Sequence, residues 1–449
     1  MERDMTVGTP WKIILNFTIP IVIGNIFQQF YSMVDTVIVG KFVGTKALAA
    51  VGSTGTIGFL ILGFLMGLTA GFTVLTSQRF GAGDMPGMRK TVGSAAVLSV
   101  IVSVVMTVIS MAFMKPLLIL MNTPEDIFQD AYKYIMIICA GIFTQVMYNL
   151  LAGILRALGN SKTPLYFLLF SAALNIVLDL ALVYGIRMGI KGAAIATVIS
   201  QIVSGIGICI YTWMKMPELR FSLRPERIKE SQSVMGEVVR YSAASSIQQS
   251  VMNFGILMIQ GLVNSFGTAV MAAFAAAVKI DSFAYMPAQE FANAFSIFIS
   301  QNRGAGKKKR VQKGVRSAVT VSAAFCICAS VLIYFGARYL MLAFIDGSEH
   351  EIIRVGIQYL HIEGAFYCGI GILFLWYGYY RAVGRPEMSV VLTVISLGTR
   401  VLLSYTLAPI KSIGVIAIWW SIPIGWFLAD VTGYVYLQYM NKKAKMCRN

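Results

Sequence analysis

The chain repeats one short phrase at the polar ends of two long apolar runs. Ser77-Gln78-Arg79-Phe80-Gly81-Ala82-Gly83 returns in the second half of the chain as Ser300-Gln301-Asn302-Arg303-Gly304-Ala305-Gly306. Three further pairs follow at nearly the same spacing: Val92-Gly93-Ser94-Ala95 with Val315-Arg316-Ser317-Ala318, Gln28-Gln29 with Gln248-Gln249, and Arg156-Ala157-Leu158-Gly159 with Arg381-Ala382-Val383-Gly384. The sequence therefore predicts two copies of one unit. Membrane proteins commonly use such a duplication to build two bundles that move about a central site, so transport is the first functional hypothesis.

Composition places this duplication in a membrane. Apolar residues make up 57% of the chain, charged residues 13%, and the mean hydropathy is +0.72, whereas soluble domains carry about 25% charged residues. A run of about 20 apolar residues spans the hydrocarbon core. Twelve such runs are present, six in each half: 12–39, 48–78, 91–114, 128–157, 163–185, 190–214, 238–264, 269–301, 315–344, 352–381, 387–409 and 412–438.

These runs predict an all-α polytopic membrane protein with twelve transmembrane helices in two pseudo-symmetric lobes. The N-terminal lobe is expected over 1–214 and the C-terminal lobe over 237–449. The longest polar stretch, 215–236, is expected to be a cytoplasmic linker. The first run is too long for a cleavable signal peptide and contains Asp35, so it is expected to remain as a span.

The net charge of +17 suggests a nucleic-acid partner, but the distribution of the charge argues against one. When both termini are placed in the cytoplasm, Lys and Arg gather in the loops on that side, which is the positive-inside bias of inner-membrane proteins. Membrane topology then explains the basic run Lys307–Arg310, which is expected to lie on the cytoplasmic side and to contact anionic membrane lipid. We expect a multi-pass protein of the cytoplasmic membrane that does not bind nucleic acid.

The chain lacks the residues for most enzyme sites. There are two histidines and six cysteines, five of the cysteines lie inside predicted spans, and no Cys-x-x-Cys occurs. The two Gly-Ala-Gly turns follow no strand and lack the Lys-Ser/Thr of a phosphate loop, so they are expected to be helix C-cap glycines. His361 and Glu363 are two residues apart and point in different directions on a helix. We expect no catalytic activity, no cofactor and no metal site.

Carboxylates inside the predicted spans are the main functional candidates, because a charge in hydrocarbon is costly. Asp430 and Glu363 lie nearer span ends and are expected to be structural. Asn175 and Asp179 are four residues apart, hence on one helix face. Gln28 similarly shares a face with Asp35, and Thr197 adds a hydroxyl in the next span. Oxygen groups of this kind suit a proton or an alkali cation, although a carboxylate pair could instead hold a cationic substrate.

The first span contains Pro20, fifteen residues before Asp35. A proline inside a helix removes a backbone hydrogen bond and kinks or loosens the helix. Pro20 is therefore a candidate helix hinge, with an inert kink as the alternative.

The acidic cluster is confined to the N-terminal half of the duplication. Asn175 maps onto Arg400, Asp179 maps onto Ser404, and Asp35 maps into 255–258, which contains no acid. The C-terminal half carries a different set of ionisable residues inside its spans. Possible substrate or polar contacts are Gln28, Gln248, Lys279, Asp281, Glu290 and Arg400. Lys279 and Glu290 share a helix face but are about 16 Å apart at 1.5 Å per residue, and part of this set is expected to form structural salt bridges.

Several of these segments resemble one family. Val34-Asp35-Thr36-Val37-Ile38-Val39-Gly40 is similar to the first-span signature of the multidrug and toxic compound extrusion (MATE) transporters. The resemblance extends over the whole chain and is closest to a bacterial branch near the NorM and DinF groups. Its other segments are Gly44, Ala47–Ala50, Arg156–Pro164, Asn175–Asp179, Gly192–Thr197, Lys279–Asp281, Pro287–Phe291 and Gln301–Gly306.

The resemblance implies two six-helix lobes with a V-shaped opening and export of organic cations against inward protons or sodium. It implies an ion-coupling site at Asp35, Asn175, Asp179 and Thr197, and a bend of the first span at Pro20. Sodium-coupled members often carry acidic residues in spans seven and ten. In this chain, span seven and the centre of span ten contain no acidic residue. We therefore favour H+ over Na+ as the coupling ion.

The sequence thus predicts a monomeric antiporter that exports amphiphilic organic cations by alternating access. One alternative is a flippase of the same superfamily for lipid or lipid-linked oligosaccharide. A flippase should line its cleft with many basic groups for a pyrophosphate headgroup, and only Lys279 and Arg400 are candidates.

Overall fold

The computed structural model describes residues 4–121, 123–216, 219 and 225–446, and these residues are almost entirely helical, with no strand among them. The all-α fold class is therefore confirmed. In chain order the elements are α1 (Pro10–Ile38), η1 (Val39–Val43), α2 (Thr45–Gly81), α3 (Met85–Leu120), α4 (Glu125–Ala140), α5 (Ile142–Ala157), α6 (Lys162–Asp179), η2 (Leu180–Gly185), α7 (Ile190–Lys215), α8 (Pro225–Asn264), α9 (Thr268–Gly304), α10 (Lys308–Leu342), α11 (His350–Gly364), α12 (Tyr367–Ala382), α13 (Pro386–Leu407) and α14 (Ile416–Met446). The η segments are π-helical.

Each predicted span overlaps one helix or one pair of consecutive helices. Among the described residues, nine helices are long and apolar enough to cross a membrane. The pairs α4–α5 and α11–α12 raise that number to eleven if each pair is one span. The predicted span 238–264 lies within α8, a 40-residue helix outside that set.

Two predicted spans are bent. The run 128–157 breaks between α4 and α5, with a bend of 44°, and the run 352–381 breaks between α11 and α12, with a bend of 53°. At the first break, a Cβ atom on Gly141 would lie 2.8 Å from a side-chain carbon of Val198. The bare backbone of Gly141 therefore lets α7 approach closely at the bend, and hydropathy alone carries no signal for it.

The predicted linker 215–236 becomes helical in its second half. Residues 217–218 and 220–224 lie outside the described part of the chain, and α8 begins at Pro225. Proline is well tolerated at the first helical position. The following Glu, Arg, Lys and Gln residues favour a helix, so the polarity of this stretch does not prevent helix formation.

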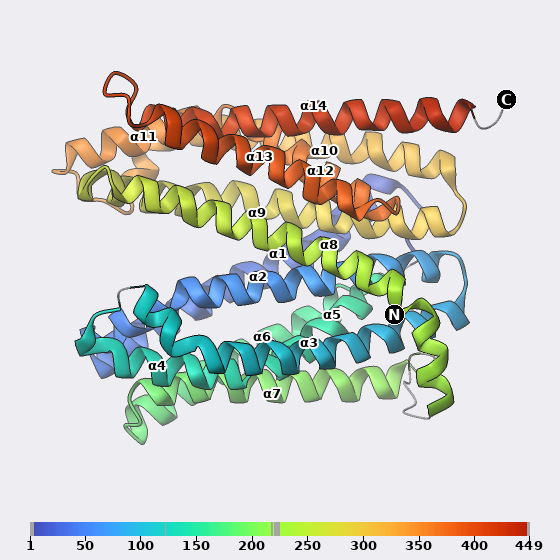
Figure 1. Cartoon of the computed structure of the whole chain (residues 1–449), viewed down its shortest axis with the longest axis horizontal. Coiled ribbons are helices and arrows are strands. Elements are labelled where there is room, and N and C mark those ends of the chain that lie inside the picture. The colour runs from blue at the N-terminus through green and yellow to red at the C-terminus, as the bar shows by residue number, and fades with distance from the viewer. Residues whose placement is uncertain (1–3, 122, 217–218, 220–224, 447–449) are drawn as a thin grey trace. The chain divides into compact units, whose positions relative to one another are not determined.

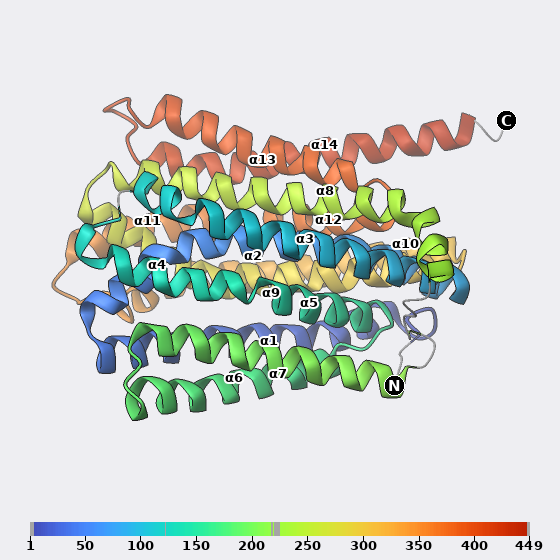
Figure 2. The ribbon, with the colours of Figure 1, turned by 60° about the horizontal axis from the view of Figure 1, so that its bottom comes forward.

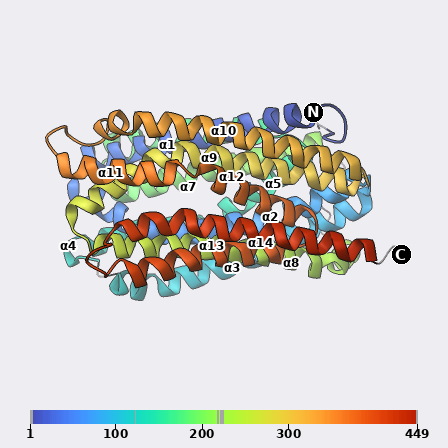
Figure 3. The same ribbon diagram turned by 90° about the horizontal axis from the view of Figure 1, so that it is seen from above.

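The described chain divides into two compact units. Unit 1 comprises residues up to Met5 and Ile19–Ser246, and unit 2 comprises Thr6–Thr18 and Ile247–Asn449. In unit 1, Phe72, Leu75 and Leu155 belong to a large apolar core shared by α2, α5 and α7, and α6 lies alongside α7 (Figures 1 and 2). In unit 2, α9 packs on α10, α11 and α12, while α13 and α14 lie side by side (Figure 3).

The backbone carries the same duplication as the sequence. Gly83 and Gly306 follow the ends of α2 and α9, and each has φ of 69°. Gly159 and Gly384, which follow α5 and α12, each have φ of 81°. Positive φ at the residue after a helix end is the usual glycine cap, so the prediction of C-cap glycines rather than a phosphate loop is confirmed.

Two glycines of α2 let the first half of α8 approach closely within unit 1. A Cβ atom on Gly67 would lie 2.5 Å from the carbonyl oxygen of Ser245, and one on Gly71 would lie 2.5 Å from Cα of Ser242. These neighbours are backbone atoms, so a new side chain could be accommodated only if a helix moved.

We expect Gly71→Ala to lower thermal stability in detergent, since overpacking of a tight contact costs about 1–3 kcal/mol. Gly52→Ala on the same helix is the matched control, because nothing lies within 4 Å of a Cβ atom there. The control should be neutral or slightly stabilising, since alanine is the better helix former. Thermal unfolding monitored by size-exclusion chromatography measures both. Equal midpoints for the two variants would contradict the proposed close crossing.

Candidate functional site

The two acidic spans of unit 1 change helix type directly beside their carboxylates. Asp35 lies in the last turn of α1 and is followed by η1, and Asp179 is the last residue of α6 and is followed by η2. Short π-helical segments are rare and occur frequently at functional sites. The two segments touch, and the rings of Phe42 and Tyr184 are 5.0 Å apart. This contact brings the acidic ends of α1 and α6 together.

An apolar cluster fixes the positions of the two π segments. Val39 of η1 and Val183 of η2 are almost fully buried and pack with Ala47, Ala131 and Ala193 of α2, α4 and α7. Alanine at these positions lets the helix backbones approach. The position of the acids is therefore set by packing of several helices, not by one loop.

Asp35 and Asp179 face each other at hydrogen-bond range. Two ionised carboxylates have no donor to share, so this contact needs one proton between them. Asp179 is completely buried, Asp35 is partly buried, and Oδ1 of each meets no hydrogen-bonding group among the described residues. The pair thus has unused acceptor capacity for a proton or a small cation.

Asn175 and Thr197 also lie in this cluster. With its amide in one orientation, Nδ2 of Asn175 donates to Oγ1 of Thr197 at 3.4 Å. With the amide reversed, Nδ2 donates to Oδ2 of Asp179 and Oδ1 accepts from the backbone N of Thr197, both at 3.3 Å. The reversed amide satisfies both of its ends and ties Asp179 to α7. Asp35, Asn175, Asp179 and Thr197 therefore lie together in unit 1.

Two tyrosines of this cluster were missed by sequence reasoning. Tyr31 interacts with both aspartates and with the side chain of Gln28, and Tyr134 interacts with both aspartates from α4. Tyr31 is four residues before Asp35, so helical spacing could have found it. Tyr134 could be found only from the packing of α4. Gln28 thus reaches the site through Tyr31.

Pro20 is buried inside α1, and the helix runs through it without a break from Pro10 to Ile38. The boundary between the units crosses α1 just before it, between Thr18 and Ile19. The hinge role of Pro20 stays a prediction.

The structure separates the polar candidates of the C-terminal half into different environments. Asp281, Glu363 and Arg400 lie near one another, but no ion pair or hydrogen bond among the described residues joins Arg400 to either acid. The structural role expected for Glu363 stays a prediction. Asn293 links Glu290 to Arg381: it donates to Glu290 and accepts from Arg381, each at 3.2 Å. Lys279 is exposed, and Gln248 is buried on α8.

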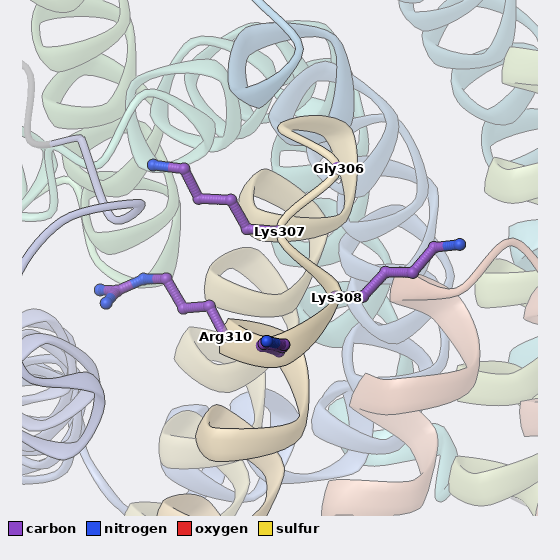
Figure 4. A pocket seen from close by; sticks show the side chains of 5 residues that line it. Gly306, Lys307, Lys308 and Arg310 are labelled. Atoms are coloured by element: carbon purple, nitrogen blue, oxygen red, sulfur yellow. The ribbon is translucent and has the colours of Figure 1, made fainter.

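A hollow of about 440 Å³ lies at the turn between α9 and α10 and is lined by Gly306 and the basic run Lys307–Arg310. Lys307 and Arg310 extend to one side of the helix start and Lys308 to the other (Figure 4). Lys307 donates to Thr6 and Arg310 donates to the carbonyl oxygen of Gly8, all within unit 2. Part of the basic run therefore fastens the N-terminal segment, a role that topology alone does not predict.

Comparison with known proteins identifies the family. A family model described as MatE matches residues 20–181 and 242–406, one range in each half of the duplication. The chain belongs to the MatE family. The family and fold predicted from the sequence are confirmed, and the protein is a multi-pass membrane protein of a transporter family.

Relatives over nearly the full length carry names of multidrug resistance proteins or of a transporter. The chain is 31% identical to the probable multidrug resistance protein YpnP of Bacillus subtilis, covering 98% of each chain. It is 25% identical to a FAD transporter of Shewanella oneidensis, covering 95% of this chain and 94% of the relative. The solved structure of a MATE protein in complex with MaL6 superposes with a TM-score of 0.90 at 23% identity and covers 99% of each chain.

The geometry of the aspartate pair generates a spectroscopic prediction. In wild type, the pair should contribute one protonated carboxyl group, because the contact between Asp35 and Asp179 requires a proton. Asp35→Asn or Asp179→Asn supplies an amide donor instead, so the infrared carbonyl band of that carboxyl group should disappear in either variant. Asp346→Asn is the control, because Asp346 is exposed outside the spans. An unchanged band in both site variants would contradict a shared proton.

Proposed function

We propose that this protein is a cation-coupled multidrug efflux antiporter that exports amphiphilic organic cations while protons move inward. The observation that supports the coupling site is the buried contact of Asp35 with Asp179, held by Asn175 and Thr197. A carboxyl pair that shares a proton can take up and release it as its surroundings change. Alternating access then delivers the proton to the opposite side from the drug.

In this proposal, the hydrogen-bond donors around the aspartates favour protons over sodium as the coupling ion. Tyr31 and Tyr134 face the aspartates, and their hydroxyl groups can donate hydrogen bonds. A sodium site needs several oxygen acceptors around an open position, whereas a shared proton needs only the two carboxyl groups. Sodium remains the alternative coupling ion, because the same carboxylate, amide and hydroxyl oxygens are hard ligands.

Support for multidrug substrates comes from the relatives, whose names include several multidrug resistance and multidrug export proteins. Embedded carboxylates suit cationic compounds, and aromatic side chains can add about 0.5–2 kcal/mol for each cation–π contact. One relative is named as a FAD transporter, so a protein of similar sequence is named for a different transported compound. A lipid or lipid-linked oligosaccharide flippase is the alternative function, and it would require a basic cleft.

The proposal includes the oligomeric state, the membrane and the orientation expected from the sequence. The protein would act as a monomer in the cytoplasmic membrane, with both termini in the cytoplasm and no cofactor. The protein would be surrounded by membrane lipid, and its binding partners would be small organic cations. Uptake of dye and of labelled lipid into proteoliposomes, with proton and sodium gradients imposed separately, distinguishes the antiporter from the flippase.

Asp35→Asn and Asp179→Asn are each expected to reduce proton-driven drug uptake roughly tenfold to a hundredfold while leaving a folded protein. The amide can still donate a hydrogen bond to the remaining carboxylate, but it cannot release a proton, so the coupled step is lost. The measurement is dye uptake in proteoliposomes, with Asp346→Asn as the control and size-exclusion chromatography as the folding check. Wild-type uptake by both site variants would remove the basis for this coupling site.

Exchange of one shared proton for one monovalent cation moves no net charge. The pH gradient then supplies about 1.36 kcal/mol per unit, and the membrane potential contributes nothing. A second proton would add about 2.3 kcal/mol per 100 mV. We expect an imposed potential, with pH and sodium equal on both sides, to leave uptake of a monovalent drug near its level without gradients. Strong accumulation after correction for passive partitioning would rule out one-for-one exchange.

A further inference from the structure

Two helices begin in one unit and continue in the other. Residues Thr6–Thr18, which include the start of α1, belong to unit 2, and the rest of α1 belongs to unit 1. The opposite holds for α8, which begins in unit 1 and passes to unit 2 after Ser246. These are the first helices of the two copies, since Gln28 in α1 corresponds to Gln248 in α8. Each copy therefore starts its first helix in the unit built mainly by the other copy.

The end of the repeated phrase and the turn after it hold the N-terminal part of α8 and the residues just before α1. In unit 1, Arg79 of α2 forms ion pairs with Glu237 of α8 at 3.2 Å and with Asp84 at 3.3 Å. In unit 2, Lys307 donates to the carbonyl oxygen of Thr6 at 3.0 Å and to its hydroxyl at 2.8 Å. Lys307 corresponds to Asp84 at the offset of the repeated phrase. Both copies thus use the same turn, with opposite charge at the equivalent position.

The hold on α8 involves backbone packing as well as charge. Gly67 of α2 lies so close to α8 that a Cβ atom on it would be 2.5 Å from the carbonyl oxygen of Ser245. Beside this contact, the hydroxyl of Ser246 donates to the carbonyl oxygen of Phe64 at 3.1 Å. Backbones packed this closely separate only when a whole helix moves, so this part of α8 should stay with unit 1.

The hold on the residues before α1 is made by cationic side chains. Besides the bonds from Lys307, Arg310 donates to the carbonyl oxygen of Gly8 at 2.6 Å, and its guanidinium lies 5.4 Å from the ring centre of Phe298. Lys307 and Arg310 extend to the same side of the start of α10 (Figure 4). The position in α9 equivalent to the glycine of α2 is Glu290, so that glycine is not repeated. Hydrogen bonds from long cationic side chains can break without repacking of helices.

We propose that Lys307 and Arg310 form a releasable clasp on residues 6–8, which opens and closes once in each transport cycle. When two bundles move during transport, a helix that is held in one unit and continuous with the other must bend or be released at one end. Because the backbone of α8 stays with unit 1, release falls on the N-terminal end of α1, the helix that carries Asp35. The opening cycle rests on the proposed function, whereas the clasp itself does not.

Hydrogen–deuterium exchange of the purified full-length protein tests the clasp without any transport. In the double variant Lys307→Met and Arg310→Met, amide exchange over residues 6–18 should become at least tenfold faster, because methionine donates no hydrogen bond. Exchange over 237–246 should not change. Lys308→Met is the matched control, since Lys308 belongs to the same basic run and extends to the other side (Figure 4). Unchanged exchange over 6–18 would overturn the clasp.

Conservative single variants keep the exchange measurement decisive if the double variant does not fold. Lys307→Met leaves Arg310 in place and should give a smaller increase over 6–18. Lys307→Arg keeps a cationic donor and should exchange more slowly than Lys307→Met. Equal exchange in these two variants would show that donation from position 307 does not hold the segment.

Thiol labelling during transport tests whether the clasp opens. In full-length protein whose six native cysteines are replaced by serine, Thr6→Cys places a thiol at a buried position and keeps the carbonyl oxygen that Lys307 contacts. We expect N-ethylmaleimide to react at least threefold faster in proteoliposomes that transport drug under a pH gradient than in resting ones. Ser245→Cys, at a buried position where α8 meets α2, is the matched control and should react equally slowly in both.

The labelling results separate this proposal from the proposed function. Equal labelling of Thr6→Cys in transporting and resting vesicles would show that α1 bends while the clasp stays closed, which overturns the opening cycle. A parallel increase at Ser245→Cys would overturn the fixed position of α8. Absence of drug transport even in the unsubstituted protein would refute the proposed function and the opening cycle with it, and exchange over 6–18 would still decide the clasp.

Discussion

The cost of a charge inside hydrocarbon is the constraint on which the rest of this structure depends. A chain with 13% charged residues keeps a few acids within its spans, and each must be neutralised by a proton, a cation or hydrogen-bond donors. In unit 1, Asp35 and Asp179 share a contact that requires a proton, and the amide of Asn175 can donate a hydrogen bond to Asp179. Glu290 uses a different solution, an amide bridge through Asn293 to Arg381.

Most of the fold could be predicted from the sequence, because hydropathy and the repeated phrase are both local signals. The spans, the glycine caps at Gly83 and Gly306 and the two copies follow from them. The bends at Gly141 and near Phe366 could not be predicted, since they depend on which side chain packs against the helix, such as Val198 at Gly141. The polar stretch after Pro225 was predicted as a linker because polarity marks solvent, yet its residues also favour helices.

The candidate site was predictable where spacing along one helix carries the information. Asn175 and Asp179 share a face of α6 at four residues apart, and the structure places both beside Thr197. The contact between Asp35 and Asp179 joins two helices distant in sequence, and Tyr134 comes from a third. Neither could be derived without the fold. The π segments η1 and η2 also escaped prediction, since their widened turns follow from the packing of Val39 and Val183.

The two copies therefore have polar residues at equivalent positions, but the types of these residues differ. Asn175 and Arg400 occupy equivalent positions in the repeat, as do Tyr134 and Tyr359. In unit 1 these positions lie beside the contact between Asp35 and Asp179, whereas Asp179 itself corresponds to Ser404 in unit 2. A neutral amide can only orient neighbouring carboxyl groups, so their charge must be balanced by something that arrives and leaves. The acids of unit 2 lie on other helices, Asp281 on α9 and Glu363 on α11, so more than one side-chain difference separates the two copies.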